Sequence, residues 1–193
     1  MSYLSEQEIR DISDNVRLLS IKEIDDISHY SFDSHIEEYN NFLEVAEKFY
    51  DLNISKTFLL IHRETEELLA YMTLSADSIK LTSEEKELHD IGKVPYASIP
   101  AVKVGKLAVN KEISDGARRK GYGSFLLEMA RAYAFSMNEL GIACRFITVD
   151  ADIEYNPETP QFYFKNGFVE NLSNKRRNAK YTISMRKDIF VDE

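Results

Sequence analysis

The chain has 193 residues, 44% hydrophobic and 30% charged, which is long enough for one domain with a sizeable core and is typical of a globular rather than a disordered protein. The net charge of −9 argues against a general nucleic-acid binder, because such affinity rests largely on neutralising phosphates. The charge is uneven, since residues 1–100 carry 9 Lys and Arg against 21 Asp and Glu, whereas residues 101–193 carry 15 against 12. We expect a single domain over residues 1–193.

The N-terminal part begins with a helix and a strand. Ser5 followed by Glu8 is a capping box, which predicts a helix to about residue 14, and the apolar run after it predicts a strand over residues 16–21. Residues 39–50 place apolar side chains at three- and four-residue steps, which predicts an amphipathic helix with one face in the core.

Two apolar runs, residues 56–63 and 68–74, are joined by four polar residues and predict an antiparallel hairpin. Residues 76–98 are polar and irregular. So long a connection in a small domain indicates a lid or substrate loop, and the alternative is a disordered insertion.

The C-terminal part reads as strand 101–109, helix 124–140 and strand 142–149. This order is a βαβ unit, in which the two strands lie side by side and parallel. A short helix over residues 162–166 and a last strand over residues 180–185 complete an α/β (α+β) fold.

A glycine turn separates strand 101–109 from the following helix. Its residues can supply the backbone N–H groups, close approach and positive charge that a diphosphate needs, and we expect Ser124 to cap the helix. The candidate residues are Arg118, Arg119, Lys120, Gly121, Gly123 and Ser124.

Spacing excludes two familiar phosphate loops. A Walker loop requires Lys followed by Ser or Thr after its last glycine, but Ser124 and Phe125 follow Gly123. A dinucleotide fingerprint requires a third glycine where Leu126 stands. The remaining pattern is Arg-x-x-Gly-x-Gly between a strand and an amphipathic helix.

This pattern resembles the signature of the GCN5-related N-acetyltransferases. Arg118, Gly121 and Gly123 match it, after a strand that ends Leu107-Ala-Val109 as strands of this family often do. A second segment, Gln161-Phe-Tyr-Phe-Lys-Asn-Gly-Phe168, is similar to the family's Phe-Tyr-x-x-x-Gly-Phe. The resemblance covers about residues 56–170.

The resemblance implies a mixed sheet of about six or seven strands, flanked by helices and splayed at the acetyl-CoA strand. It implies that acetyl-CoA is the cosubstrate, with backbone groups near Leu107 and Val109 holding pantetheine, N–H groups from Arg119 to Ser124 holding the pyrophosphate, and no metal. One departure is the nine-residue step from Val109 to Arg118, where about five residues are usual.

The resemblance also implies that Tyr163 donates a proton to the departing thiolate, although packing beside Phe162 and Phe168 is the alternative. No general base is evident, because Lys103 stands where some relatives carry a glutamate. Deprotonation through water is equally compatible. Four further carboxylates near strand ends are candidate bases, although each reads mainly as a solvated loop group: Glu112, Asp150, Asp152 and Glu154.

The four histidines lack metal-ligand spacing, and His89, within residues 76–98, is the one to test. Cys144 is the only cysteine and lies in an apolar run, which favours packing over chemistry. The chain begins with neither a basic nor an apolar segment and has no long uncharged apolar run, so we expect a cytoplasmic protein without a membrane span.

Segment 32–74 is similar to antitoxin-paired acetyltransferases that modify charged tRNA. The basic surface available for tRNA is chiefly Lys175-Arg-Arg177 with Lys180, and the first hundred residues are strongly acidic, so the preferred acceptor is a primary amine of a small molecule or peptide. The alternatives are a toxin-type enzyme acting on aminoacyl-tRNA and a non-catalytic acyl-CoA-binding regulatory protein. A homodimer and an antitoxin partner stay open.

Overall fold

The computed structural model describes residues 3–172 and 181–191. In chain order the helices and strands are α1 (Glu6–Asn15), β1 (Val16–Ser20), the 3-10 helices η1 (Ile21–Glu23) and η2 (Ile27–His29), α2 (Glu37–Asp51), β2 (Lys56–His62), β3 (Leu68–Lys80), α3 (Ser83–Leu88), β4 (Ser98–Val109), α4 (Tyr122–Glu139), β5 (Phe146–Asp152), α5 (Thr159–Lys165), β6 (Val169–Glu170) and β7 (Thr182–Asp188).

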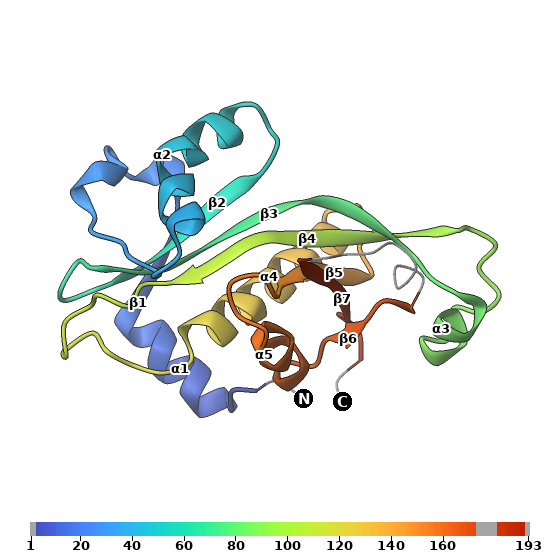
Figure 1. Cartoon of the computed structure of the whole chain (residues 1–193). Helices are drawn as coiled ribbons and strands as arrows, with labels where there is room; N and C mark the ends of the chain where they lie inside the picture. Colours follow the sequence, from blue (N-terminus) through green and yellow to red (C-terminus); the bar gives the residue numbers. More distant parts are fainter. Residues whose placement is uncertain (1–2, 173–180, 192–193) are drawn as a thin grey trace. The chain divides into compact units, whose positions relative to one another are not determined.

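The described strands form one mixed seven-stranded sheet in the order β1-β2-β3-β4-β5-β7-β6 (Figure 1). The strands β4 and β5, which α4 connects, are neighbours, as the predicted βαβ unit requires. The predicted α+β fold class with a mixed sheet and flanking helices is therefore confirmed. Among the described residues, no helix combines the length and apolar character needed to cross a membrane.

Contacts within the chain define two compact units. Unit A comprises Leu4–Ser75 and Val104–Glu128, and unit B comprises Tyr3, Ala76–Lys103 and the described residues from Met129 onward. The elements β3, β4 and α4 each contribute residues to both units. A single domain over residues 1–193 stays a prediction.

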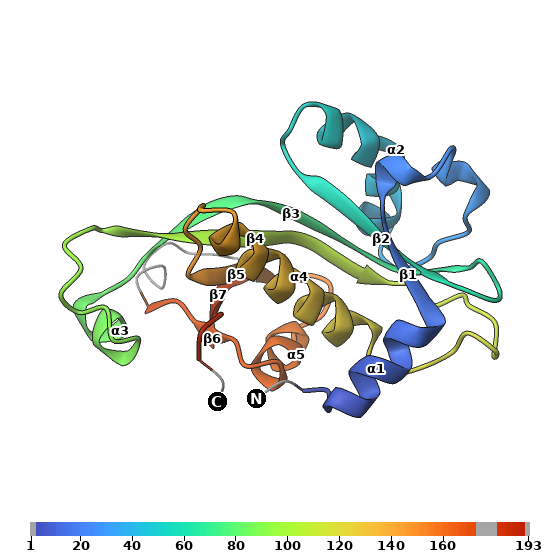
Figure 2. The same cartoon turned by 180° about the vertical axis from the view of Figure 1, so that it is seen from behind.

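In unit A, α1 leads directly into β1 (Figure 2). The capping box is present, because Ser5 N–H donates to the Glu8 carboxylate at 2.8 Å and Glu8 N–H donates to Ser5 Oγ at 3.3 Å. The strand β2 pairs antiparallel with β1 and β3, which confirms the predicted hairpin.

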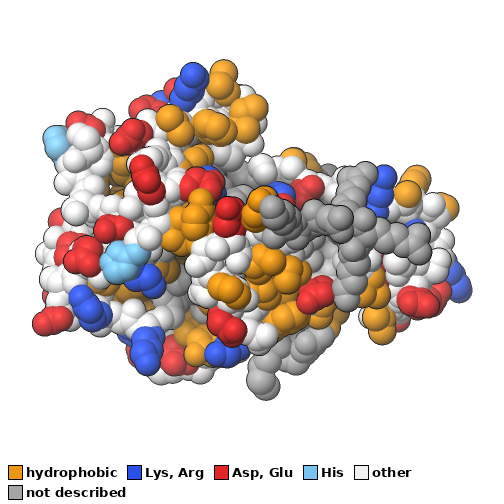
Figure 3. Space-filling model, viewed as in Figure 1, with side chains coloured by type: hydrophobic (Ala, Val, Ile, Leu, Met, Phe, Trp, Pro, Cys, Tyr) orange, Lys and Arg blue, Asp and Glu red, His pale blue; other side chains and the backbone are white. Residues whose placement is uncertain are grey.

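The helix α2 packs one face against the rest of unit A, since its residues Leu43 and Ala46 are buried in the core there. Aromatic side chains extend this contact, and the hydroxyl of buried Tyr71 donates to Tyr39 O at 2.7 Å. The other face exposes apolar side chains, visible over α2 and the turn into β2 in Figure 3. These side chains are Val45, Phe49, Leu52 and Ile54.

In unit B, the irregular connection predicted over residues 76–98 is wrong. The strand β3 continues to Lys80, α3 occupies Ser83–Leu88, and β4 begins at Ser98. Two causes combine: alternate residues at or next to both strand ends are buried in one cluster with the distant Phe146, and Thr82 with Glu85 forms a capping box that starts α3. The buried strand-end residues are Ile79, Leu81, Ile99 and Ala101.

Other boundaries in unit B shift by a few residues. The strand predicted over residues 142–149 is β5 (Phe146–Asp152), so Cys144 precedes the strand, although it is buried as expected. Burial raises the pKa of its thiol. The strand predicted over residues 180–185 is β7 (Thr182–Asp188), which pairs antiparallel with both β5 and β6.

Candidate active site

A glycine shapes the turn before α4. Gly121 has a φ of +103°, which other residues rarely adopt, and Tyr122 after it begins the helix. A Cβ atom on Gly121 would lie 3.1 Å from Leu4 Cδ2 and 3.4 Å from Ile12 Cδ1. Leu4, just before α1, and Ile12, within α1, are both buried. Glycine is therefore required here by conformation and favoured by space.

The start of α4 supplies backbone donors. The first N–H groups of a helix have no carbonyl one turn earlier, and the helix dipole favours an anion there. Regular bonding starts where Phe125 N–H donates to Gly121 O at 2.8 Å. The predicted helix cap at Ser124 is wrong, because the Gly121 turn brings the chain into α4 at Tyr122, and Ser124 lies buried inside the first turn with Gly123.

The basic residues of the turn remain accessible at its surface. Arg118 donates to Ile113 O at 3.0 Å and keeps its side chain 62% exposed. Arg119 pairs with Asp11 of α1 at 3.6 Å, with both side chains partly exposed. Lys120 is exposed as well. Such exposed pairs are weak, so an incoming phosphate can recruit these side chains.

The extra residues between β4 and Arg118 form a fixed loop. Ser114 donates to the Glu67 carboxylate from its backbone N–H at 2.8 Å and from its hydroxyl at 2.6 Å. Both bonds lower the pKa of Glu67, and the bond from the Ser114 hydroxyl has the larger effect. At the end of the loop the Tyr122 hydroxyl donates to Ala117 O at 2.6 Å, and burial raises the pKa of Tyr122. The longer connection between β4 and Arg118 is thus hydrogen-bonded to the β2–β3 hairpin.

The end of β4 is also held by a side chain. Lys106 N–H donates to the hydroxyl of buried Thr73 at 2.9 Å. A Cβ atom on Gly105 would lie 2.9 Å from that hydroxyl, so the preceding position requires a glycine or a shift of Thr73. Leu107 and Val109, the residues predicted to hold pantetheine, follow and are half-buried. The strand end and the glycine turn both belong to unit A.

Tyr163 lies in α5 of unit B and is 8% exposed. Its ring makes edge contacts with Phe162 at 5.0 Å and Phe168 at 5.4 Å between centroids. Packing, the alternative to catalysis, therefore occurs. The role of Tyr163 as proton donor rests on the sequence motif and stays a prediction.

The carboxylates considered as bases are mostly engaged. Asp150 and Asp152 belong to β5 rather than to a loop, and Asp150 forms an ion pair with Lys103 of β4. Asp152 accepts the N–H of Glu154 at 2.9 Å. Glu112 lies 3.2 Å from His35, with both side chains well exposed. None of these contacts marks a dedicated general base.

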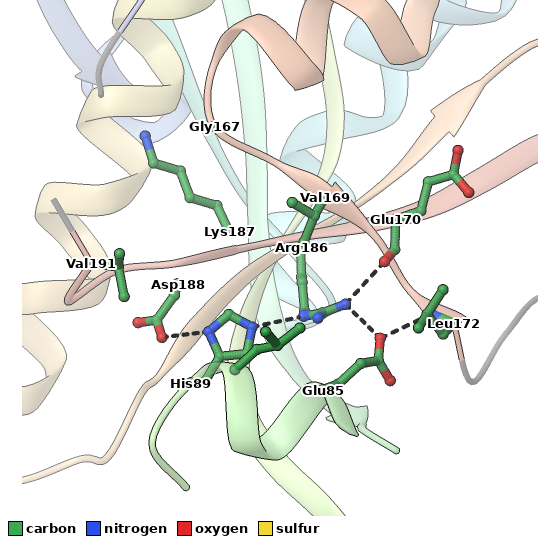
Figure 4. Close-up of a pocket in the computed structure, with 11 residues that line it drawn as sticks. Glu85, His89, Gly167, Val169, Glu170, Leu172, Arg186, Lys187, Asp188 and Val191 are labelled. Carbon is green, nitrogen blue, oxygen red and sulfur yellow. Dashed lines mark hydrogen bonds and ion pairs between the residues drawn. The ribbon is translucent and has the colours of Figure 1, made fainter. Parts of the chain in front are cut away.

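A buried charge cluster in unit B was missed by sequence reasoning (Figure 4). Arg186 of β7 pairs with Glu85 of α3 at 2.7 Å, with the two side chains 3% and 1% exposed. Arg186 Nε–H also donates to His89 Nε2 at 3.3 Å, so Nδ1 carries the imidazole proton and donates to Asp188 at 2.9 Å. Arg145 pairs with the same Asp188 oxygen at 2.7 Å.

This cluster joins α3 to β7 and lines a cavity of about 320 Å³. His89 is the histidine singled out for testing. Its hydrogen bonds to Arg186 and Asp188 help to hold α3 against β7. The capping box at Thr82 and Glu85 was a readable signal for α3, but the pairing of Glu85 with Arg186, a hundred residues away in sequence, was not. No group of side chains suited to a metal ion occurs within residues 3–172 and 181–191.

Comparison of the sequence with models of known protein families, and with curated proteins, gives no match. Solved structures do match. The chain superposes on a tyrosine-to-phenylalanine mutant of KacT with a TM-score of 0.68 and 24% identity, covering 91% of this chain and 95% of that one.

Two structures of AtaT give similar agreement. AtaTR bound with AcCoA has a TM-score of 0.65 at 21% identity, over 91% of this chain and 95% of that one. AtaT complexed with acetyl-methionyl-tRNAfMet has a TM-score of 0.65 at 19% identity, over 88% and 94%. At this identity the likeness establishes architecture. The chain therefore has the GCN5-related N-acetyltransferase fold that its two motifs imply.

Proposed function

We propose that this protein is an acetyl-CoA-dependent N-acetyltransferase. The observation that carries the proposal is the turn at Gly121, which lies between the end of β4 and the start of α4. The end of β4 is held by the Thr73 hydroxyl, and the start of α4 presents free backbone N–H groups to a diphosphate. A neighbour of the same fold over most of its length is described as bound with AcCoA. We propose that the residues predicted from the sequence bind acetyl-CoA.

The acceptor we propose is the amino group of an aminoacyl-tRNA. The sequence favoured a small amine or a peptide, but the similar structures support the alternative better, since one is AtaT complexed with acetyl-methionyl-tRNAfMet. The described contacts of Glu112, Asp150 and Asp152 mark no dedicated base, and an α-amino acceptor needs one less than a lysine amine does. An α-amino group has a pKa of about 8 and is partly neutral at pH 7, whereas a lysine amine, with a pKa of about 10.4, is almost fully protonated.

In the proposed reaction the neutral amine attacks the thioester carbonyl. The N–C bond forms and the C–S bond breaks, yielding the N-acetyl product and CoA thiol. Backbone N–H groups near Leu107 and Val109 would stabilise the oxyanion. Tyr163 would protonate the thiolate, the amine's proton would pass to water, and Tyr163 would regain a proton from water. The Tyr163 step is testable by itself, because Tyr163→Phe should lower turnover and leave acetyl-CoA binding intact.

Exposed basic side chains near the glycine turn can supply positive charge for tRNA. Lys111, Arg118 and Lys120 are exposed around the turn. The basic run at Lys175–Arg177 with Lys180 lies outside the described residues. Binding through such side chains releases counterions, so affinity for tRNA should fall steeply with salt.

The test is thiol release from acetyl-CoA with four acceptors: charged tRNA, the same tRNA deacylated, a peptide and a panel of small amines. We expect release with charged tRNA alone, salt sensitivity, and growth arrest on expression. Release with peptide or small amines instead would restore the sequence-based preference. Tight acetyl-CoA binding without release would make the chain a non-catalytic acyl-CoA-binding protein. A homodimer stays a prediction.

A further inference from the structure

Asn110, the residue after β4, is a buried amide whose bonds all lie within unit A. Its Nδ2 donates to Ser31 O at 3.0 Å and to Leu68 O at 2.8 Å. Its Oδ1 accepts the N–H groups of Asp33 at 3.1 Å and of Glu112 at 3.0 Å. The side chain therefore makes four hydrogen bonds to backbone, the full capacity of an amide.

Two donors and two acceptor positions must be met at once, which fixes the orientation of the amide and the choice of residue. A carboxylate at position 110 would place an acceptor against two carbonyl oxygens, and a hydroxyl could reach only part of the set. Loss of the side chain would strand two carbonyls and two N–H groups near the protein interior.

Asn110 also fixes what lies around it. The backbone N–H of Asn110 donates to Leu69 O at 2.8 Å, and the backbone N–H of the next residue, Lys111, donates to Asp33 O at 2.7 Å. Asp33 in turn accepts from Asn40 of α2 at 2.9 Å. One side chain thus joins the end of β4, the start of β3, the segment before α2 and the first residues of the loop that leads to Gly121.

We propose that Asn110 is a positioning residue for acetyl-CoA. It follows Leu107 and Val109, whose backbone would meet pantetheine, and it begins the loop whose far end carries the diphosphate turn. With Thr73 it clamps the strand end on both sides of those residues. The inference rests on the proposed function and adds a residue outside both family motifs.

The test compares Asn110→Ala with a matched amide in unit B. Asn138 donates to Ala134 O at 3.0 Å and Cys144 O at 2.9 Å and accepts from Cys144 N–H at 3.0 Å, so Asn138→Ala also removes several amide-to-backbone bonds. Unfolding midpoint and acetyl-CoA affinity by calorimetry are measured for each. We expect both variants to lose stability, and only Asn110→Ala to bind acetyl-CoA at least about tenfold more weakly.

Turnover provides a second readout. Misplacing the strand end by about 1 Å would lower kcat/KM by about a hundredfold in Asn110→Ala. Equal affinity and turnover in the two alanine variants, at equal loss of stability, would make Asn110 a structural residue and overturn the proposal. Failure of the wild-type chain to bind acetyl-CoA would instead remove the proposed function, so the two failures are distinguishable.

Asn110→Asp keeps the inference testable if the alanine variant does not fold. The aspartate has the same shape and can keep the bonds to Asp33 and Glu112, but its charged form repels the carbonyls of Ser31 and Leu68. At lower pH the protonated carboxyl can donate to one of them. Affinity relative to wild type at the same pH should therefore recover as pH falls from 7 to about 5. A pH-independent ratio would contradict the proposal.

Discussion

Gly121→Ala tests the diphosphate turn in a way that separates strain from binding. Holding alanine at φ +103° should cost about 1–2 kcal/mol, and its Cβ would meet Leu4 Cδ2 at 3.1 Å. If the turn moves to relieve this strain, each lost charge-assisted bond to phosphate would remove about 1.5–3 kcal/mol. We therefore predict a roughly ten- to hundredfold weaker acetyl-CoA affinity.

Two other glycines provide controls. Gly141 has φ +83° and nothing within 4 Å of an added Cβ, so Gly141→Ala should lose similar stability at the far end of α4 and leave affinity unchanged. Gly116 has open space and no positive φ, so Gly116→Ala should change neither quantity. Urea unfolding and calorimetric titration with acetyl-CoA measure both. Wild-type affinity in a folded Gly121→Ala variant would refute the assignment of the turn.

Three further predictions concern unit B. Arg186→Met should destabilise it by about 3–5 kcal/mol in urea unfolding because it leaves Glu85 charged and unpaired, whereas Arg17→Met, at a partly exposed pair, should cost at most about 1 kcal/mol. Burial raises the pKa of Glu85 and Asp188, but hydrogen bonds and neighbouring charges outweigh burial and lower both pKa values. The contribution of these two carboxylates to stability is therefore present at neutral pH and lost as pH falls below about 4. Circular dichroism should show this loss as an acid unfolding transition. Cys144 should react with iodoacetamide only as fast as unit B opens, and rapid labelling of native protein would contradict its burial.

Sequence patterns predicted the elements best where chemistry is local. The capping box at Ser5, the hairpin at residues 56–74 and the glycine turn all depend on neighbours within a few residues, and the structure contains each of them. The motif at Arg118 to Gly123 then led to the fold. These features carry their signal in residue type and spacing, without any tertiary contact.

Long-range pairing explains what the sequence could not predict. Residues 76–98 appeared irregular because Glu85 and His89 are polar, yet Glu85 is buried against Arg186 and His89 is half-buried against Asp188, each roughly a hundred positions away. Likewise, Asn110 looks like an ordinary strand-end polar residue until its partners at Ser31 and Leu68 are known. Ser124 was misassigned as a cap because Gly121 lets α4 start two residues earlier.

The most direct test of the central claim is the identity of the acetylated product. The purified chain is incubated with acetyl-CoA and charged tRNA, the RNA is digested with nuclease, and the aminoacyl-adenosine is analysed by mass spectrometry. The account predicts an N-acetylated aminoacyl-adenosine that is absent without enzyme and strongly reduced with Gly121→Ala. Unmodified aminoacyl-adenosine, together with acetylation of a peptide or small amine under the same conditions, would contradict it.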